Sequence, residues 1–221
     1  MAIRADNLRK FYTVGGQTVK ALDGVSLDIA DGEYVTVVGT SGSGKSTLMN
    51  ILGCLDSPTS GSYYLDGEDV SELSDNALSE IRSRKIGFIF QSFNLIPGLT
   101  ALENIELPLL YRKVSKAKRS AAALDALESV RLSDRALHRP RELSGGQQQR
   151  VAIARAIAAN PKVILADEPC GNLDSRSGAE VLDILDELNR NGKTIVMITH
   201  NEDTAKKAKR LIRISDGKIV Q

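Results

Sequence analysis

The chain has 221 residues, of which 42% are hydrophobic and 26% charged, and its formal net charge is +1. This is the composition of an ordinary globular protein with one large domain or two small ones, so it excludes an intrinsically disordered chain. Because the charges nearly balance, there is no overall electrostatic footprint for nucleic acid or for an anionic membrane surface. We therefore expect no nucleic-acid partner.

The cysteines and the hydropathy pattern restrict the possible classes of protein further. Cys54 and Cys170 lie far apart without the spacing of metal ligands, which argues against a disulfide framework and favours a reducing compartment. No stretch reaches the roughly 18 uncharged apolar residues that span a bilayer. Residues 1–12 lack the apolar run of a signal peptide. We expect a soluble chain that works at a membrane only through a partner.

The first ninety residues contain several strand-like segments. Residues 25–29 alternate between apolar and polar, residues 34–39 form a short apolar run, and residues 30–33 between them indicate a turn. Residues 62–70 predict a short strand and turn, and the apolar residues 86–90 predict a buried strand. We expect the early strands and residues 60–70 to form a small antiparallel sheet.

The middle of the chain is helical and the end returns to strands. Apolar residues recur with helical spacing from residue 101 to residue 160. Residues 163–167 and 194–199 have buried-strand character, and the helical segment 180–190 lies between them, with Asn191-Gly192 as its C-cap. Buried strands that alternate with helices predict an α/β fold with a parallel sheet, into which the helical middle third is inserted.

A glycine-rich loop follows the first apolar run. Residues 39–47 read GTSGSGKST and match G-x-x-x-x-G-K-[ST], between a strand and a helix start as this motif requires. Gly39, Gly42 and Gly44 permit backbone angles that turn consecutive N–H groups inward, so the loop and the helix N-terminus form an anion nest. A flexible Gly/Ser linker would need neither the lysine nor the flanking elements. The loop therefore predicts binding of a nucleotide polyphosphate.

The side chains of this loop have expected roles. Lys45 places a positive charge on the β- and γ-phosphates, the Ser46 hydroxyl is placed to ligate Mg²⁺, and Thr47 contacts the α-phosphate. The loop residues expected to bind the nucleotide are Gly39, Thr40, Ser41, Gly42, Ser43, Gly44, Lys45, Ser46 and Thr47.

Two acidic residues and a histidine follow later strands. Asp167 ends the strand 163–167 and Glu168 comes next, while His200 directly follows the strand 194–199. The carboxyl ends of parallel strands meet at one edge of a sheet, so these side chains should reach the phosphate loop. Asp167 would hold Mg²⁺, directly or through water, Glu168 would polarise the attacking water, and His200 would bridge to the γ-phosphate. The alternatives are an acidic turn and a surface histidine.

The segment 143–150, LSGGQQQR, resembles the signature motif of ABC ATPases. Four other segments agree with that family in order and spacing, namely the phosphate loop, Gln91, the segment 163–169 and His200. The resemblance covers essentially the whole chain. It implies a P-loop NTPase (RecA-like) fold, with a mostly parallel sheet core, a small antiparallel β subdomain and an inserted helical subdomain.

The same resemblance implies a domain organisation and two cofactors. Residues 1–221 would form a single ABC ATPase domain, whose nucleotide-binding core comprises 1–90 and 161–221 and whose helical subdomain comprises 91–160. The expected cofactors are ATP and Mg²⁺. A GTPase is disfavoured because the sequence has no N-K-x-D motif to recognise guanine.

The signature motif also has a physical interpretation. Ser144, Gly145 and Gly146 open a helix, so their N–H groups form a second anion site. In ABC ATPases two subunits pair head to tail, and the resemblance implies that Ser144, Gly145, Gly146 and Gln147 of one subunit close over the γ-phosphate held by the other. The predicted assembly is therefore a homodimer that ATP closes and hydrolysis opens.

Further roles are carried over from the family one residue at a time. Tyr12 matches the aromatic residue that stacks on adenine, with the adjacent Phe11 as the rival choice. Gln91 resembles the glutamine that contacts Mg²⁺ and the attacking water. Asp174 matches a residue that faces the partner subunit. Cys170 departs from the family, which usually has threonine or serine after the DEP triplet; we interpret it as a tolerated substitution, with an oxidisable thiol as the alternative.

The site expected from the sequence falls into two functional sets. The catalytic residues would be Lys45, Gln91, Glu168 and His200. The metal ligands would be Ser46, Gln91 and Asp167.

One branch of the family matches more closely. Residues 86–109 together with the signature helix resemble the ATP-binding subunits of the lipoprotein-releasing and macrolide-export type. That branch implies ATP-powered export or mechanotransmission at the cytoplasmic face of the inner membrane, through a separate permease subunit and, beyond it, a periplasmic adaptor. The permease would contact residues 91–105, where Phe93, Leu95 and Ile96 either form the interface or cover the chain's own core. An ABC ATPase that signals in cell division through a membrane partner is the alternative function.

Overall fold

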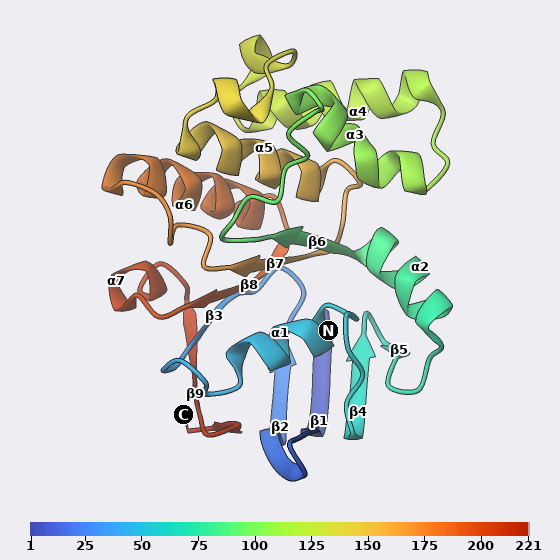
Figure 1. Cartoon of the computed structure of the whole chain (residues 1–221), viewed down its shortest axis with the longest axis vertical. Coiled ribbons are helices and arrows are strands. Elements are labelled where there is room, and N and C mark those ends of the chain that lie inside the picture. The colour runs from blue at the N-terminus through green and yellow to red at the C-terminus, as the bar shows by residue number, and fades with distance from the viewer. Residues whose placement is uncertain (221) are drawn as a thin grey trace.

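The computed structural model describes residues 1–220, and over that range the strands form two sheets (Figure 1). The smaller sheet is antiparallel with the order β2-β1-β4-β5, and its strands are β1 (Ile3–Val14), β2 (Gln17–Ile29), β4 (Ser60–Leu65) and β5 (Glu68–Asp69). The larger sheet has the order β10-β9-β3-β8-β7-β6, and its strands are β3 (Tyr34–Val38), β6 (Ile86–Ile89), β7 (Val163–Asp167), β8 (Thr194–Thr199), β9 (Arg210–Ser215) and β10 (Lys218–Ile219). Its pairs are parallel except β10 with β9. The predicted α/β fold is confirmed.

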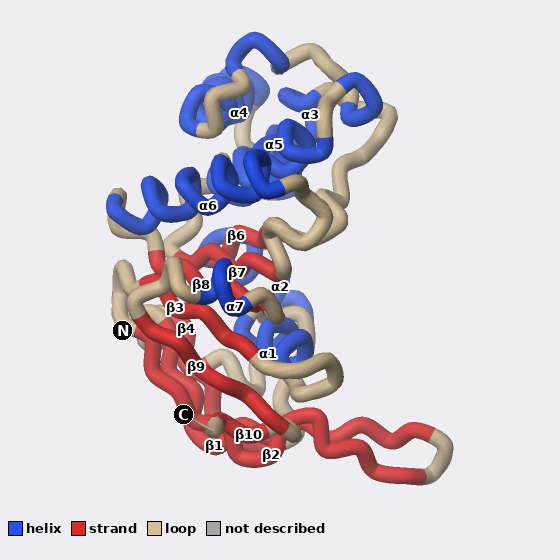
Figure 2. Tube along the Cα trace, turned by 90° about the vertical axis from the view of Figure 1, so that its left-hand side faces the viewer, coloured by secondary structure: helices blue, strands red, loops and turns tan. Residues whose placement is uncertain are grey.

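The helices connect these strands and cover the larger sheet. In chain order they are α1 (Lys45–Leu52), α2 (Asp75–Lys85), α3 (Ala101–Tyr111), α4 (Lys116–Ser129), α5 (Gly145–Ile157), α6 (Ser175–Arg190) and α7 (Glu202–Ala205). Helices α3, α4, α5 and α6 form a layer on one side of the larger sheet, while α1 and the antiparallel sheet lie on the other side (Figures 1 and 2). Among the helices within residues 1–220, none is both long enough and apolar enough to cross a bilayer.

The central strands of the larger sheet are buried on both faces. Val163 and Leu165 of β7 pack into one hydrophobic cluster, whereas Ile164 and Ala166 pack into another on the opposite face. Because side chains alternate along a strand, a strand that is covered on both sides is apolar throughout. This explains why β3, β7 and β8 appear in the sequence as apolar runs.

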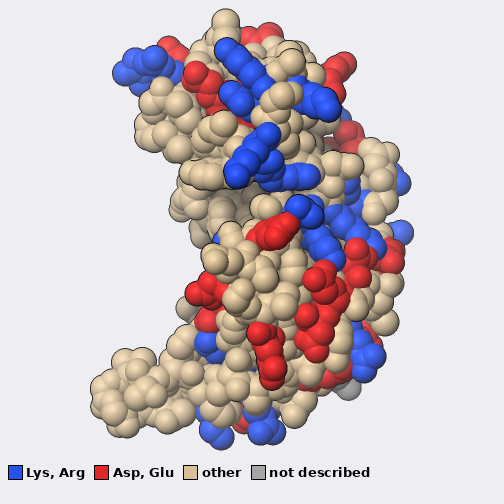
Figure 3. Space-filling view, turned by 90° about the vertical axis from the view of Figure 1, so that its right-hand side faces the viewer, with Lys and Arg blue, Asp and Glu red and all other residues tan. Residues whose placement is uncertain are grey.

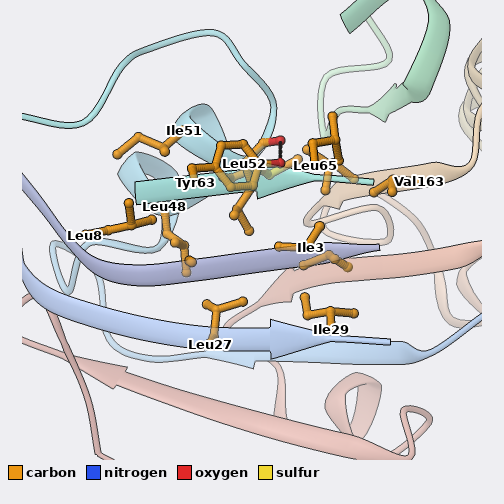
Figure 4. Close-up of a cluster of buried hydrophobic side chains, with 14 of the residues drawn as sticks. Ile3, Leu8, Leu27, Ile29, Leu48, Ile51, Leu52, Tyr63, Leu65 and Val163 are labelled. Carbon is orange, nitrogen blue, oxygen red and sulfur yellow. Dashed lines mark hydrogen bonds between the residues drawn. The ribbon is translucent and has the colours of Figure 1, made fainter. Parts of the chain in front are cut away.

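The first cluster joins the two sheets. It combines side chains of β1, β2 and β4 with α1 and one face of the larger sheet (Figure 4). Tyr63 of β4 is 1% exposed in this cluster, and its hydroxyl donates to the Leu52 carbonyl at 2.7 Å. The only polar atom of the buried side chain is therefore paired. The bond ties the end of α1, the helix that follows the glycine-rich loop, to β4.

The loop before α3 is shaped by a buried asparagine. Asn104 is fully buried; its Oδ1 accepts from the Ile96 N–H at 2.7 Å, and its Nδ2 donates to the carbonyls of Ile96, Leu99 and Thr100. Thr100 caps α3 and forms a capping box with Glu103. The segment expected to meet a permease is thus a well-ordered loop held by side chains of the helix that follows it.

Several elements were not predicted from the sequence. Helix α2 and the strands β9 and β10 were not predicted, although the sequence of β9 has the alternating pattern of a strand. Ile212 and Ile214 are buried and Arg213 between them is exposed, which is the alternation of a half-buried strand. The dipeptide Asp216-Gly217 after it has positive φ angles at both residues, as a tight hairpin turn requires.

Candidate active site

Three neighbouring strands of the larger sheet end at one edge. Strand β3 lies beside β8 and β8 beside β7, and the last residues of these strands, Val38, Thr199 and Asp167, lie within one residue of each other in register. The glycine-rich loop follows the first strand, His200 follows the second and Glu168 follows the third. The structure therefore brings the loop, the acidic pair and the histidine to the same edge.

The loop residues 39–47 require glycine at two positions. A Cβ atom on Gly39 would lie 2.3 Å from the Ile214 carbonyl oxygen, and one on Gly44 would lie 2.4 Å from the Ala21 carbonyl oxygen. Gly44 also has a φ of +104°, which side-chain-bearing residues rarely adopt. The neighbouring backbone therefore leaves room only for glycine, and the loop is held against β9 and β2.

Helix α1 begins inside this loop. Its N-cap is Gly44, which lacks a side chain to cap the helix, and its first turn contains no acidic residue. Free N–H groups at a helix N-terminus attract anions, and here the hydroxyls of exposed Ser46 and half-buried Thr47 lie in the same turn. Lys45 is 9% exposed and its Nζ donates to the carbonyls of Gly39 and Thr40 at 2.8 and 2.6 Å. The arrangement is an anion-binding nest with an internal cation.

Asp167 lies half-buried at the end of β7. Burial, and secondarily the charge of Glu168, raise the pKa of Asp167, whereas Lys45 opposes that shift. A cation placed before this carboxylate would stabilise its charged form. The Asp167 carboxylate, the Ser46 hydroxyl and the Gln91 amide all contain oxygen atoms, which are the ligands that Mg²⁺ prefers. The described residues contain no cluster of three or more His, Cys, Asp or Glu side chains that could hold a metal ion alone. This donor set fits a Mg²⁺ ion that also keeps water and phosphate ligands.

Glu168 is held in a strained conformation. Its φ is +44°, a value that costs a non-glycine residue about 1–3 kcal/mol and that tends to occur at functional sites. Its Oε2 accepts from the Thr199 hydroxyl at 2.9 Å, and its Oε1 accepts from the His200 N–H at 2.7 Å and lies 2.6 Å from His200 Nδ1. The carboxylate is therefore oriented by two consecutive residues at the end of β8.

Gln91 lies against the loop that follows Glu168. Its Nε2 donates to the Asn172 Oδ1 at 3.2 Å, and the Asn172 Nδ2 donates to the Gln91 carbonyl at 3.1 Å. A Cβ on Gly171 would lie 2.7 Å from the Gln91 Nε2, so the two loops are in contact. The structure thus brings Gln91 to the loop of the acidic pair.

The signature residues open α5 as predicted. Ser144 is the N-cap and forms a capping box with Gln147, and Gly146 is buried so closely that a Cβ would lie 2.6 Å from the Ser177 Oγ. Ser177 belongs to α6, which is capped by Asp174 through bonds from two backbone N–H groups. The nearest atoms around the signature glycines therefore belong to residues outside the loop 39–47.

Tyr12 and Phe11 lie near the end of β1, close to the turn into β2, and have different surroundings. The β1–β2 hairpin projects from the rest of the chain (Figure 2). The Tyr12 hydroxyl donates to the Asp56 Oδ2 at 2.8 Å. Burial, and secondarily Asp56, raise the pKa of Tyr12, and the nearby hydroxyl of Thr47, the last residue of the phosphate loop, opposes this shift. Phe11 has Lys20 over its ring instead. These contacts bring Tyr12, and not Phe11, to the loop.

Some residues of the site were missed in the sequence. Thr199 orients Glu168, and Asn172 orients Gln91. Gln149 donates to the Pro169 carbonyl at 2.6 Å. The family motifs point to residues that would meet the nucleotide, whereas these three meet other protein groups. The apolar residues expected at a permease interface differ in their exposure. Ile96 is 46% exposed, whereas Leu95 packs partly against the chain's own core.

Residues 22–171 match the ABC transporter family, and this range includes the glycine-rich loop, the signature and the acidic pair. The chain belongs to that family. It is an ATP-binding protein and an ATPase of the ABC type. The expectation from the sequence is therefore confirmed at the level of family and activity.

The relatives of this ABC protein span nearly its whole length. The ABC transporter ATP-binding protein YknY of Bacillus subtilis is 52% identical over 218 residues, covering 99% of this chain and 95% of that protein. The macrolide export ATP-binding/permease protein MacB of Brucella melitensis is 51% identical over 218 residues, covering 99% of this chain but 34% of that protein. These relatives favour the transporter-type function over the cell-division alternative.

A solved structure is similar in fold as well as in sequence. The ATP-binding cassette MJ0796 of Methanocaldococcus jannaschii, in a dimeric post-hydrolysis state bound to ADP and Pi, matches with a TM-score of 0.91 and 47% identity. The match covers 99% of this chain and 97% of that one.

Proposed function

We propose that this chain powers a membrane complex of the export or mechanotransmission type by closing on ATP as a head-to-tail homodimer. The observation that carries the proposal is that the loop 39–47 leads into α1 and the signature residues Ser144–Gln147 open α5, and these two helices lie on opposite sides of the larger sheet (Figures 1 and 2). The dimeric cassette structure of a relative 50% identical over 222 residues supports completion of each site by a second copy.

The proposed division of labour follows from the geometry of the first site. The N–H groups at the start of α1 would bind phosphate oxygens. Lys45 would leave the loop carbonyls to which it now donates and would donate to the phosphates instead. Ser46, Asp167 and Gln91 would supply oxygen ligands to Mg²⁺, which when bound would neutralise charge between the phosphates. Tyr12 would stack on the adenine ring.

Glu168 would act on the attacking water. Its carboxylate is oriented by Thr199 and by the backbone of His200, so it would polarise water from a fixed position. His200 is exposed, with 71% of its side chain accessible, and would reach the γ-phosphate on the side away from Glu168. Gln91 would position the same water, because its loop touches the loop after Glu168.

A basic groove supports the proposed permease contact. The groove has a volume of about 1430 Å³ and lies between α2 and α3, next to Asn94 in the segment predicted to meet the permease. Its charged lining residues are Glu80, Arg82, Arg84, Arg112, Lys113 and Arg155. Glu80 is already paired with Arg84 at 2.7 Å, so an excess of positive charge remains (Figure 3). The groove would accept a short permease helix that carries carboxylates.

The place of action follows from this partner. The chain would lie at the cytoplasmic face of the inner membrane, held there by the permease, and an adaptor on the other side would be reached only through that permease. The ATP-binding/permease organisation of MacB supports this arrangement.

The test is the mass of the Glu168→Gln variant by light scattering, with and without ATP and Mg²⁺. Hydrolysis should slow by at least about 100-fold because the base is lost, while nucleotide binding stays intact, so the ATP-bound dimer should accumulate. A doubling of the mass with ATP is the expected result. A variant that binds ATP and remains monomeric would contradict closure of the isolated chain.

A further inference from the structure

The loop that carries Gln91 is held at both ends by side chains of α5. Gln149 Nε2 donates to the Phe90 carbonyl at 3.3 Å, just before Gln91. The guanidinium of Arg155 donates to the Phe93 carbonyl at 2.8 Å and to the Asn94 carbonyl, just after it. A single helix therefore spans the loop on both sides of the glutamine.

The backbone of this loop needs such support. Phe93 and Asn94 both have positive φ angles, +58° and +51°, in the left-handed region that residues with side chains rarely adopt. Two such residues in succession are unfavourable unless the surrounding structure imposes them. Half-buried Arg155 donates to the carbonyl of each, and partial burial lowers its pKa.

Gln149 carries a second sign of constraint. It is fully buried, and its Oε1 has no hydrogen-bond partner among residues 1–220. Its Nε2 nevertheless reaches two carbonyls, Phe90 and Pro169, of which the second directly follows Glu168. A buried unpaired oxygen is a cost that a purely structural apolar residue would not have. The side chain links the Gln91 loop to the segment of the catalytic glutamate.

These contacts give α5 three connections at once. The helix begins at the signature residue Ser144, holds the Gln91 loop through Gln149 and Arg155, and reaches Pro169. Arg155 also lines the groove proposed above for the permease. A displacement of α5 would therefore displace the Gln91 loop with it.

We propose that Gln149 and Arg155 are positioning residues, which hold the backbone on both sides of Gln91 and thereby fix where this glutamine lies. This inference rests on the proposed function, because Gln91 must act on the water or metal of the ATP site. Neither residue touches the nucleotide; both act through the backbone on either side of Gln91.

The test is a double-mutant cycle on the ATPase rate of the full chain. Arg155→Met should lower kcat about tenfold, because two charge-assisted hydrogen bonds to the loop are lost, and should leave the Kd for ATP within about twofold. Gln91→Ala should lower kcat by a similar factor. The double variant should be no slower than Gln91→Ala alone, since both changes remove the same glutamine from its place.

Arg119→Met is the matched control. Arg119 belongs to α4 in the same helical layer, but its guanidinium donates to the Glu106 carboxylate at 2.8 Å and not to the Gln91 loop, so the kcat of this variant should stay within about twofold of the parent. Arg155→Lys keeps the positive charge and can still donate to one of the carbonyls, so it should recover part of the rate. The melting temperature shows whether Arg155→Met folds poorly. The cycle can then be run with the lysine variant.

The outcomes separate this inference from the proposed function. A parent chain without ATPase activity would contradict the proposed function itself. With an active parent, losses at Arg155 and Gln91 that multiply in the double variant would overturn the inference. An undiminished rate in Gln91→Ala, or an equal loss in Arg119→Met, would overturn it as well.

Discussion

Replacing Tyr12 by alanine should weaken ATP binding, whereas replacing its neighbour Phe11 should not. The Tyr12 hydroxyl donates to Asp56 and lies near Thr47, the last residue of the phosphate loop, whereas the Phe11 ring lies under Lys20. Stacking of a base on an aromatic ring contributes about 1–3 kcal/mol, so the Kd of Tyr12→Ala for ATP should rise about 5- to 150-fold.

The assay is calorimetric titration of the Glu168→Gln variant, in which turnover is blocked. Each aromatic variant is titrated with ATP and with inorganic tripolyphosphate, which keeps the phosphate contacts and lacks the base. Tyr12→Ala should lose affinity for ATP alone, and Phe11→Ala should bind both like the parent. A larger loss in Phe11→Ala, or an equal loss of tripolyphosphate affinity in Tyr12→Ala, would refute the assignment.

Two lysines provide a finer control on the same pair. Lys10 Nζ lies 5.2 Å from the centroid of the Tyr12 ring and Lys20 Nζ lies 5.6 Å from that of Phe11, so each ring has a cation over one face. Lys10 Nζ also donates at 2.5 Å to Asp56, the acceptor of the Tyr12 hydroxyl, so Lys10 holds the ring in two ways. A cation over an aromatic ring contributes at least about 0.5–1 kcal/mol, so Lys10→Met should raise the Kd for ATP about two- to fivefold. Lys20→Met removes the cation over the Phe11 ring and should leave the Kd unchanged.

Three further predictions concern the phosphate loop, the acidic pair and the cysteine. Lys45→Ala should abolish nucleotide binding in the same titrations, and retained affinity would contradict the assignment of the loop. Thr199→Val removes the hydroxyl that donates to Glu168. A hydrogen bond to a charged group contributes about 1.5–3 kcal/mol, so kcat should fall about tenfold at unchanged KM. An unaltered kcat would mean that Glu168 is oriented without the Thr199 hydroxyl. Burial, and secondarily Glu168, raise the pKa of Cys170 to about 11, so only about one thiol in 10³ is ionised at pH 8. Alkylation followed by mass spectrometry should therefore be slow at pH 8 and rise with pH, and rapid labelling at pH 7 would contradict this.

The strands around the site could be predicted because each is covered on both faces. Burial on two sides favours apolar residues at most positions, and β3, β7 and β8 are recognisable as short apolar runs for that reason. The motif residues could then be placed, since the segments after neighbouring parallel strands meet at one edge of the sheet. Strand β9 pairs with β3 but alternates in exposure along part of its length, so its signal was weaker.

The residues that orient the site could not be predicted in the same way. Thr199 looks like the last residue of an apolar strand, and its hydroxyl is recognisable as a partner of Glu168 only when β7 and β8 are placed side by side. Gln149 is one of three consecutive glutamines, and only the packing of α5 shows which of them is buried. Such contacts join residues that are 20 to 59 positions apart, so local spacing carries no trace of them.

The strain at Glu168 and the bonds at its carboxylate have one explanation in common. The Glu168 N–H donates to the Ile198 carbonyl of β8 at 2.9 Å and so continues the pairing of β7 with β8, and the positive φ of Glu168 then sets the direction of its side chain. The side chain then reaches Thr199 and His200, the next two residues of the same segment. An extended Glu168 would place the carboxylate elsewhere and leave those donors without it. The unfavourable backbone angle is therefore offset by three hydrogen bonds to β8 and the residue after it, and the position of the acid relative to His200 depends on all of them.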